Sequence, residues 1–294
     1  MNCSINTFYI AFLPRYSYYR CMTYNLIYPN LNFAHKIEES NNYVEAFEKH
    51  FHLIYEMLYF VSGDVELVLE NKVFHLNPGD LIFIKPGQHH HVVPNHQKTY
   101  ERYVIKFPEY KIPKNLLELL KNKPTRTSIN KTPLAELFKS IDWHYSTYQG
   151  QNLPLILESV LIEILTYFCS IEEEKDNHAS IYNHKMTEII AYINENIANP
   201  LQIEDICQHF HYSKSYIYKE FKLAMDVPIK QYIIAKKILL AESLIQNGHK
   251  PIEIYEKCGF VDYSTFYRNY IKIIGKAPSL GGSKTLPISD AEQN

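Results

Sequence analysis

Near the end of the chain one pattern occurs twice: a short amphipathic helix, a turn and a second helix. The first copy spans residues 203–221 and the second spans residues 254–270, about 49 residues further on. Ser213 and Asp262 stand at equivalent positions, where a side-chain oxygen can accept hydrogen bonds from the first amides of a helix. Gly259 suits the sharp turn of the second copy, because glycine tolerates positive φ. The repeat therefore predicts two helix–turn–helix units in one helical domain.

The second helix of each copy has an apolar side and a polar side. Ile217 and Phe221 in the first copy, and Phe266 and Tyr270 in the second, have helical spacing and are expected to face inward. The opposite sides carry side chains that can contact phosphates and base edges. One such side alone could be an ordinary solvated surface, but two in a repeat favour DNA binding. The predicted DNA-binding residues are Lys214, Ser215, Tyr218, Lys219, Lys222, Tyr263, Ser264, Thr265, Arg268 and Lys272.

Residues 189–279 resemble the DNA-binding domain of the AraC/XylS transcription regulators, in which a long helix joins two helix–turn–helix units. The resemblance implies double-stranded DNA as a partner, with RNA polymerase as a further one. Its residues are Tyr192-Ile193, Ile206-Cys207, Ser213 to Ile217, Phe221-Lys222, Ala241, Leu244-Ile245, Gly259-Phe260, Asp262, Ser264, Phe266, Arg268, Gly275 and Pro278. The sequence departs from the family pattern at Cys207, His211, Asp226, Lys237 and Tyr255. The bulky Tyr255 is expected to loosen the second unit.

The first half of the chain changes its apolar period at Pro108. Residues 61–107 read as short strands of a small barrel or sandwich. Two amphipathic helices follow, behind Pro133 and Pro154. In the second helix, the stripe Leu157, Leu161, Ile164 and Phe168 has heptad spacing, so it is either a dimer seam or packed against its own domain. The predicted segments are 1–30 uninterpreted, 31–110 effector barrel, 111–171 linking and dimerisation helices, 172–183 linker, 184–281 DNA-binding domain and 282–294 flexible tail.

Histidines and a glutamate gather at the start of the barrel region. On an extended strand, His50, His52 and Glu56 would point to the same side. This stretch is similar to the cupin motif HxHxxxE, and residues 79–90 are similar to the second cupin motif, whose last ligand aligns with His90. AraC-type regulators commonly carry a cupin-like sensor in this position. The implied fold class is α+β, with an N-terminal cupin-like β-barrel, linking helices and an all-α double helix–turn–helix domain.

The cluster of His50, His52, Glu56 and His90 admits three interpretations: a polar pocket for a small-molecule effector, a divalent metal site or a structural cluster. We favour the polar pocket, with no cofactor and with a carbohydrate as a candidate effector. By strand alternation, His89 and His91 are expected to be surface residues. Six nearby aromatic residues could stack on a sugar ring but are more simply core residues: Tyr55, Tyr59, Phe60, Phe74, Phe83 and Tyr103.

Composition limits the remaining function classes. The net charge of −2 gives no overall attraction to nucleic acid or membrane, so DNA binding depends on where the charges lie. The five cysteines lack paired spacing, which favours a reducing cytoplasm. The apolar stretch near the N-terminus is too short to cross a membrane. We therefore predict a cytoplasmic, homodimeric, effector-responsive transcription regulator, most simply an activator and not an enzyme; the alternative is a metal-dependent cupin enzyme with an appended DNA-binding domain.

Overall fold

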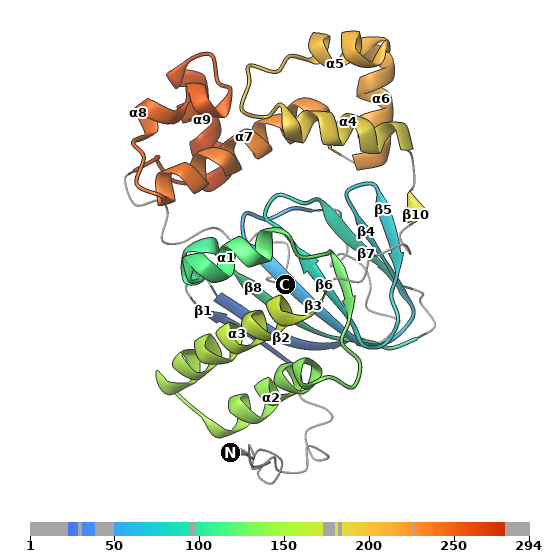
Figure 1. Ribbon diagram of the computed structural model, residues 1–294, viewed down its shortest axis with the longest axis vertical. Helices are drawn as coiled ribbons and strands as arrows, with labels where there is room; N and C mark the ends of the chain where they lie inside the picture. Colours follow the sequence, from blue (N-terminus) through green and yellow to red (C-terminus); the bar gives the residue numbers. More distant parts are fainter. Residues whose placement is uncertain are drawn as a thin grey trace, which may run out of the picture.

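The computed structural model describes residues 23–28, 31–38, 50–94, 98–172, 180–181, 184–225 and 227–279. Two β-sheets form the first domain, helices cover one side of it, and a helical domain is stacked on one end of the strands (Figure 1). This is the predicted α+β architecture, with a β-domain followed by helix–turn–helix units.

All strand pairs in the β-domain are antiparallel. The larger sheet has the order β1-β2-β8-β3-β6-β9, and the smaller has the order β10-β5-β4-β7. The strands are β1 Tyr24–Tyr28, β2 Leu31–Glu38, β3 Tyr55–Ser62, β4 Val65–Leu69, β5 Lys72–His75, β6 Asp80–Ile84, β7 His90–Pro94, β8 Tyr100–Phe107, β9 Arg126–Ser128 and β10 Ser180–Ile181.

Successive residues of the central strand β3 face different cores, because side chains alternate across a strand. Met57 and Tyr59 pack on the side covered by helices, whereas Leu58 and Phe60 point between the two sheets. Glu56 shares the inward side with Leu58, so the strand period places this carboxylate inside the barrel.

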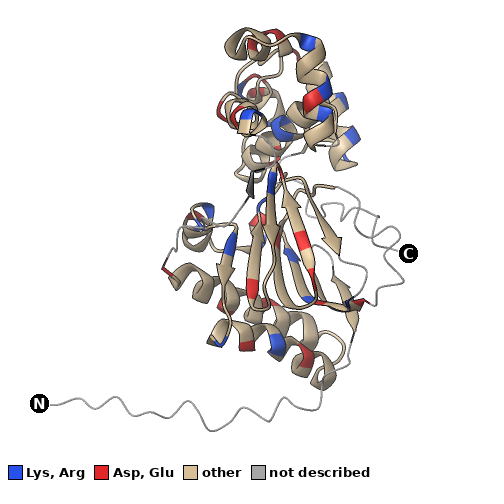
Figure 2. Cartoon of the chain, turned by 90° about the vertical axis from the view of Figure 1, so that its right-hand side faces the viewer, with Lys and Arg blue, Asp and Glu red and all other residues tan. Residues whose placement is uncertain are grey.

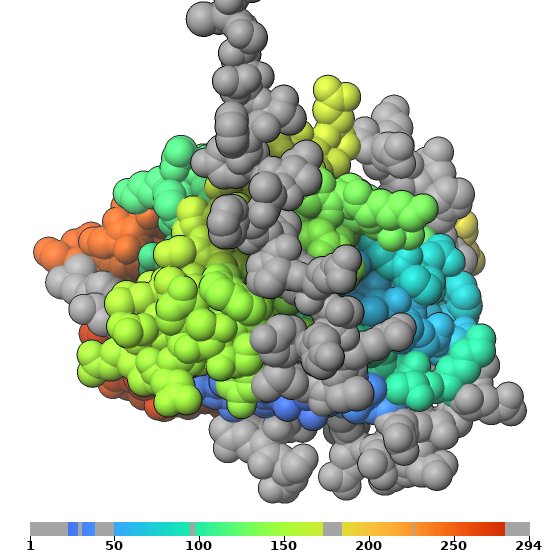
Figure 3. Space-filling view, turned by 90° about the horizontal axis from the view of Figure 1, so that it is seen from below, coloured from blue at the N-terminus to red at the C-terminus, as the bar shows by residue number. Residues whose placement is uncertain are grey.

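Three helices cover the outer side of the larger sheet: α1 Lys114–Lys121, α2 Pro133–Thr147 and α3 Asn152–Ser170. In α3 the stripe of Leu157, Leu161, Ile164 and Phe168 is at most 1 % exposed and lies in the core beneath the helix. The interpretation of this stripe as a dimer seam is therefore wrong, and its packing against its own domain is confirmed. By length and composition α3 could cross a membrane, but here its stripe is the core side of a domain helix. Figure 3 shows the outward-facing surface of α2 and α3, coloured green to yellow-green.

Two short strands lie where no structure was expected. Strand β1 falls within the uninterpreted segment 1–30 and pairs with β2. Strand β10 falls within the predicted linker 172–183 and pairs with β5. Neither has a periodic signal, because a strand of two to five residues is defined mainly by its partner. The tail 282–294 and the rest of the segment before residue 23 lie outside the described residues.

A buried polar network fixes α2 to the sheet. Asp142 of α2 accepts hydrogen bonds from Tyr24 Oη at 2.9 Å and Tyr103 Oη at 2.7 Å. His35 Nδ1 lies 3.2 Å from the same carboxylate, and its Nε2 lies 3.1 Å from Glu101 Oε1. Burial alone would lower the pKa of His35, but the hydrogen bonds and charges of Asp142 and Glu101 outweigh it and raise the pKa. His35 therefore lies between two carboxylates that favour its protonated form.

The helical domain contains both predicted units. The first has α5 and α6, the second has α8, a 3₁₀ turn and α9, and α7 joins them. Tyr216 N donates to Ser213 Oγ at 3.2 Å, and Thr265 N donates to Asp262 Oδ1 at 2.7 Å, which confirms both caps. The elements are α4 His184–Glu195, α5 Ile203–Phe210, α6 Lys214–Met225, α7 Ile229–Gln246, α8 Pro251–Ile254, η3 Glu256–Cys258 and α9 Tyr263–Ile274.

The two turns show how the departures from the family pattern are accommodated. His211 has φ of 57°, in the left-handed region that Gly259 occupies at 71° in the second unit. Tyr255 follows the end of α8 and lies half-buried at the edge of the second core, beside Tyr263. Loosening of the second unit by Tyr255 stays a prediction.

Candidate DNA interface and effector pocket

The inward residues of α6 and α9 are as predicted. Ile217, Phe221 and Phe266 have no exposed surface, and Tyr270 is 1 % exposed. Every predicted DNA-binding side chain is exposed or half-buried, although Tyr218 and Tyr263 also pack against the cores of their units. Figure 2 shows lysine and arginine positions along the helices of this domain. Both helices therefore present a polar surface suited to a DNA groove.

Two of the predicted DNA contacts already have partners within the domain. Lys214 forms an ion pair with Glu204 of α5, which raises the pKa of Lys214 through that hydrogen bond. Arg268 donates to Thr265 Oγ1 at 3.4 Å, one turn earlier in α9. To contact DNA, Lys214 would have to exchange its carboxylate partner for a phosphate, whereas Lys219 makes no ion pair within the described part of the chain. We therefore expect Lys219 to contribute more to DNA affinity than Lys214.

The predicted pocket residues come together inside the barrel, at the end that faces the helical domain. His52 Nε2 lies 2.7 Å from Glu56 Oε2, and His90 Nε2 lies 3.5 Å from the same oxygen. The rings of His50 and His90 are 4.4 Å apart between centroids. The chain does not reach this arrangement as one regular strand, because β3 begins only at Tyr55 and His50 forms an isolated bridge with His90.

Lys106 is a member of this cluster that the sequence reasoning missed. It stands opposite Glu56 in the β3–β8 pairing, is 3 % exposed, and places its Nζ 3.5 Å from Glu56 Oε2. Burial would raise the pKa of Glu56, but Lys106, His52 and His90 hold it well below its usual range. A lysine within the apolar run Tyr103–Phe107 was the available signal, since buried lysines are almost always paired.

His52 connects the pocket to the chain that follows it. Burial lowers the pKa of His52 to about 4, against the opposing effect of Glu56. The neutral ring has one N–H, yet it faces two acceptors: Glu56 Oε2, and the Ile54 carbonyl 2.8 Å from Nδ1. His52 therefore donates to the pocket or to Ile54, but not to both at once.

His89 was predicted at the surface, and this prediction is wrong. It is 3 % exposed, with its ring 4.7 Å from that of Phe51 and 5.2 Å from that of Tyr232 in α7. Strand alternation correctly turns it away from His90, but the second domain covers the side on which it lies. His91 is half-buried. The six aromatic residues near the cluster are all buried in the two cores of the β-domain, so their interpretation as core residues is confirmed.

The end of the barrel that holds the histidine cluster rests directly on α7. Ile54 is 2 % exposed and packs in the core of the second helix–turn–helix unit, with Ile238 of α7. Gly87 lies so close to Leu239 that a Cβ on it would overlap that side chain. Only Leu53 therefore separates His52 from Ile54, whose side chain is buried in the helical domain.

The hairpin between β4 and β5 makes a second contact with the helical domain. Glu70 accepts a hydrogen bond from Tyr232 Oη at 3.2 Å and pairs with Lys236 Nζ at 3.4 Å. Asn71 Nδ2 donates to Thr187 Oγ1 of α4 at 3.0 Å. Glu70 also accepts from the amide of His89, next to pocket residue His90.

Two family models match the chain. One, described as an AraC-like ligand binding domain, matches residues 36–165, and the other, described as a helix-turn-helix domain, matches residues 206–280. The HTH-type transcriptional regulator YfiF of Bacillus subtilis is 22% identical over 84% of this chain and 86% of its own length. The melibiose operon regulatory protein of Escherichia coli is 30% identical over 34% of this chain and 33% of its own length.

Two solved structures are also similar to this chain. ToxT from Vibrio cholerae O395 is 17% identical, over 85% of this chain and 96% of that one, with a TM-score of 0.34. The AraC-like transcriptional activator CuxR is 13% identical, over 74% of this chain and 79% of that one, with a TM-score of 0.32.

Proposed function

We propose that this chain, which belongs to the AraC family of transcription regulators, reads DNA with α6 and α9 and adjusts that reading to a small molecule held near His52, Glu56 and His90. The observation that carries the proposal is the short path from the histidine cluster to the helical domain: His52 Nδ1 lies 2.8 Å from the carbonyl oxygen of Ile54, and Ile54 is buried against α7. A ligand that changes the partner of His52 acts on the helix that joins the two units.

The experiment that tests DNA reading is a footprint on a duplex selected from random sequences by the wild-type protein. Because α7 joins the two units, α6 and α9 should enter adjacent major grooves on one side of the duplex, roughly 34 Å apart. We expect two protected groove segments for each protein molecule. Protection of a single segment would contradict reading by both helices.

Alanine in place of Lys219 or Arg268 is expected to weaken DNA binding. A residue that reaches a base should cost about 1–3 kcal/mol and relax sequence preference, whereas a phosphate contact should lower affinity for all sequences and reduce the salt slope. Titrations at several salt concentrations separate these outcomes. Lys250→Ala is the matched control, because Lys250 is exposed in the same domain but outside both recognition helices. Unchanged affinity and salt slope in both variants would remove these residues from the DNA interface.

The pocket chemistry favours an organic effector with hydrogen-bonding groups, a carbohydrate being one candidate. His90 Nε2 is buried and, within the described part of the chain, has no hydrogen bond of good geometry. Lys106 supplies donors and Glu56 supplies acceptors on the same inner surface. These groups suit hydroxyl or carboxylate groups of a small polar molecule.

The donor set also allows a test of the metal interpretation. Ring nitrogens of His50, His52 and His90 lie within 4.8 Å of one another, so three neutral imidazoles could hold a divalent ion. The fourth expected ligand, Glu56, is instead paired with Lys106, whose positive charge opposes a cation. A metal bound there would fix the three rings together. Elemental analysis of the purified protein distinguishes this from an organic effector.

Alanine at His52, Glu56 or His90 is expected to abolish the response to the effector while leaving DNA binding intact. Loss of coupling should remove about 1–3 kcal/mol of effector-dependent change in DNA affinity. The effector is first found by a thermal-shift screen of sugars, sugar acids and divalent metals, because a ligand of the folded state raises its stability. His75→Ala is the control, since the His75 side chain is 65% exposed on β5 of the same domain. A response that survives all three variants would place the effector elsewhere.

The proposal also includes the location of the protein, its partner in transcription and its oligomeric state. We place the protein in the cytoplasm, as a non-enzymatic activator that contacts RNA polymerase when bound to DNA. A homodimer would use the outer surface of α3, where Leu155 is 64% exposed, because the apolar stripe on the other side of that helix is already buried. Sedimentation of wild type and Leu155→Asp tests this arrangement.

A further inference from the structure

The two helix–turn–helix units touch each other directly, in addition to being joined by α7. Gly259 lies in the turn of the second unit, with φ of 71°. A Cβ at this position would overlap the carbonyl oxygen of Asn199 and lie 2.9 Å from that of Ile197, both in the connection between α4 and α5. Backbone of the second unit thus rests against backbone of the first, and only glycine allows this separation.

Lys237 holds this contact from the middle of α7. Its Nζ donates to the Gly259 carbonyl at 2.6 Å, and it lies 5.8 Å from the centroid of the Phe260 ring. The residue is 6 % exposed, and burial lowers its pKa. A buried ammonium is costly unless it is hydrogen-bonded, so the bond to Gly259 accounts for the buried position of Lys237.

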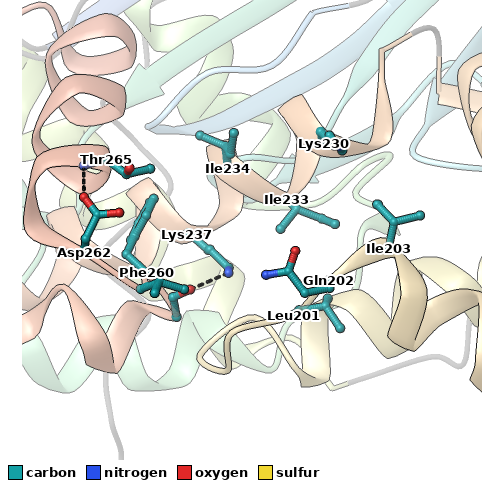
Figure 4. Close-up of a pocket in the computed structure, with 12 residues that line it drawn as sticks. Leu201, Gln202, Ile203, Lys230, Ile233, Ile234, Lys237, Phe260, Asp262 and Thr265 are labelled. Carbon is teal, nitrogen blue, oxygen red and sulfur yellow. Dashed lines mark hydrogen bonds between the residues drawn. The ribbon is translucent and has the colours of Figure 1, made fainter.

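A cavity lies beside the contact, between the two units (Figure 4). Its volume is about 330 Å³, and its walls come from the start of α5, from α7 and from residues 259–265. Lys237 and Gln202 lie on facing sides of this space in Figure 4. Because side chains do not fill the cavity, tight packing does not fix the two units here. Beside this space, the turn of the second unit is held by the contact of Gly259 with Asn199 and by the bond from Lys237.

The same segment leads straight into the second recognition helix. Asp262, which caps α9, and Thr265, a predicted DNA contact, both line the cavity. Movement of Gly259 relative to the first unit therefore moves the base-facing side of α9 relative to that of α6.

We propose that the contact between Lys237 and Gly259 sets the distance between the two recognition helices, α6 and α9. It thereby sets the number of base pairs that must separate the two DNA elements read by these helices. Lys237 is a positioning residue, which acts on DNA specificity through Gly259. The proposal rests on the proposed function, because it needs both helices to read DNA.

The selected site contains two stretches of base pairs, one read by α6 and the other by α9. The test measures affinity for a series of duplexes in which these two elements are moved apart or together by one or two base pairs. Wild type should show a sharp optimum, with a loss of about tenfold or more per one-base-pair change. Lys237→Met keeps the length of the side chain but removes the hydrogen-bond donor. Its affinities across the spacing series should agree to within about threefold, and it should bind a duplex that contains only one element as tightly as wild type does. Lys237→Arg should restore the optimum.

Two further variants make the result decisive. Lys230→Met removes a charge from the same helix and the same cavity without touching Gly259, and should keep the wild-type optimum. Gly259→Ala separates the units by another route and should broaden or shift the optimum even if Lys237→Met folds poorly. A sharp, unshifted optimum in either Lys237→Met or Gly259→Ala would overturn the proposal. Failure of wild type to bind any selected duplex would instead overturn DNA reading itself.

Discussion

Leu161→Asp is expected to unfold the β-domain rather than to dissociate a dimer. Leu161 is 1 % exposed beneath α3, so an aspartate there would be an unpaired charge in an apolar core and should cost at least about 4 kcal/mol. Fluorescence reports this domain selectively, because the chain has one tryptophan, Trp143, in α2. Chemical denaturation followed by fluorescence gives the change in unfolding free energy.

The matched control lies on the neighbouring helix α1. Leu119 is 56% exposed, and Leu119→Asp should change stability by no more than about 0.5 kcal/mol. If Leu161→Asp kept the stability of wild type and changed only its sedimentation, the apolar stripe of α3 would be a dimer interface after all.

Asp142→Ala is expected to destabilise the β-domain by about 3–5 kcal/mol, because it removes one of the two carboxylates that favour the protonated form of the buried His35. The variant leaves Tyr24 and Tyr103 without their hydrogen-bond acceptor as well. Tyr103→Phe removes a single hydrogen bond and should cost only about 1 kcal/mol, which makes it a graded control. Equal effects of the two substitutions would show that the network does not act through the charge of His35.

The pH dependence of this network has a defined sign. The folded-state pKa of His35 is raised above its unfolded value, so protonated His35 stabilises the fold fully below about pH 6.5. That contribution is lost as the pH rises through the folded-state pKa. The difference in unfolding free energy between wild type and His35→Gln should therefore be largest in acid and should narrow as the pH rises. A difference independent of pH would mean that folding does not shift the pKa of His35.

Local patterns in the sequence predicted the features that depend on near neighbours. Ser213 and Asp262 cap helices because the amides they accept from lie three residues away. The strand Val65–Leu69 and the inward residues of α6 and α9 follow from periods of two and 3.6. The cluster of His50, His52, Glu56 and His90 was found by motif, although its geometry departs from a regular strand.

The features that the sequence left open depend on which side chains are buried by segments that are distant in the sequence. The stripe of α3 has the same spacing whether a sheet or a second copy buries it, so only the packing of the larger sheet decides between them. His89 is buried by α7, and the partners of Asp142 lie 39 to 118 residues away in the chain.

The sequence by itself determined that this chain has a β-domain with a histidine cluster and two helix–turn–helix units, because periodicity, caps and turns act within a few residues. The tertiary structure decided that Lys106 joins the cluster, that Ile54 is buried against α7 and that Lys237 bonds Gly259. Each of these contacts joins segments whose local patterns are satisfied without it. Burial and hydrogen-bond satisfaction across the whole fold select such contacts, and a linear pattern does not encode them.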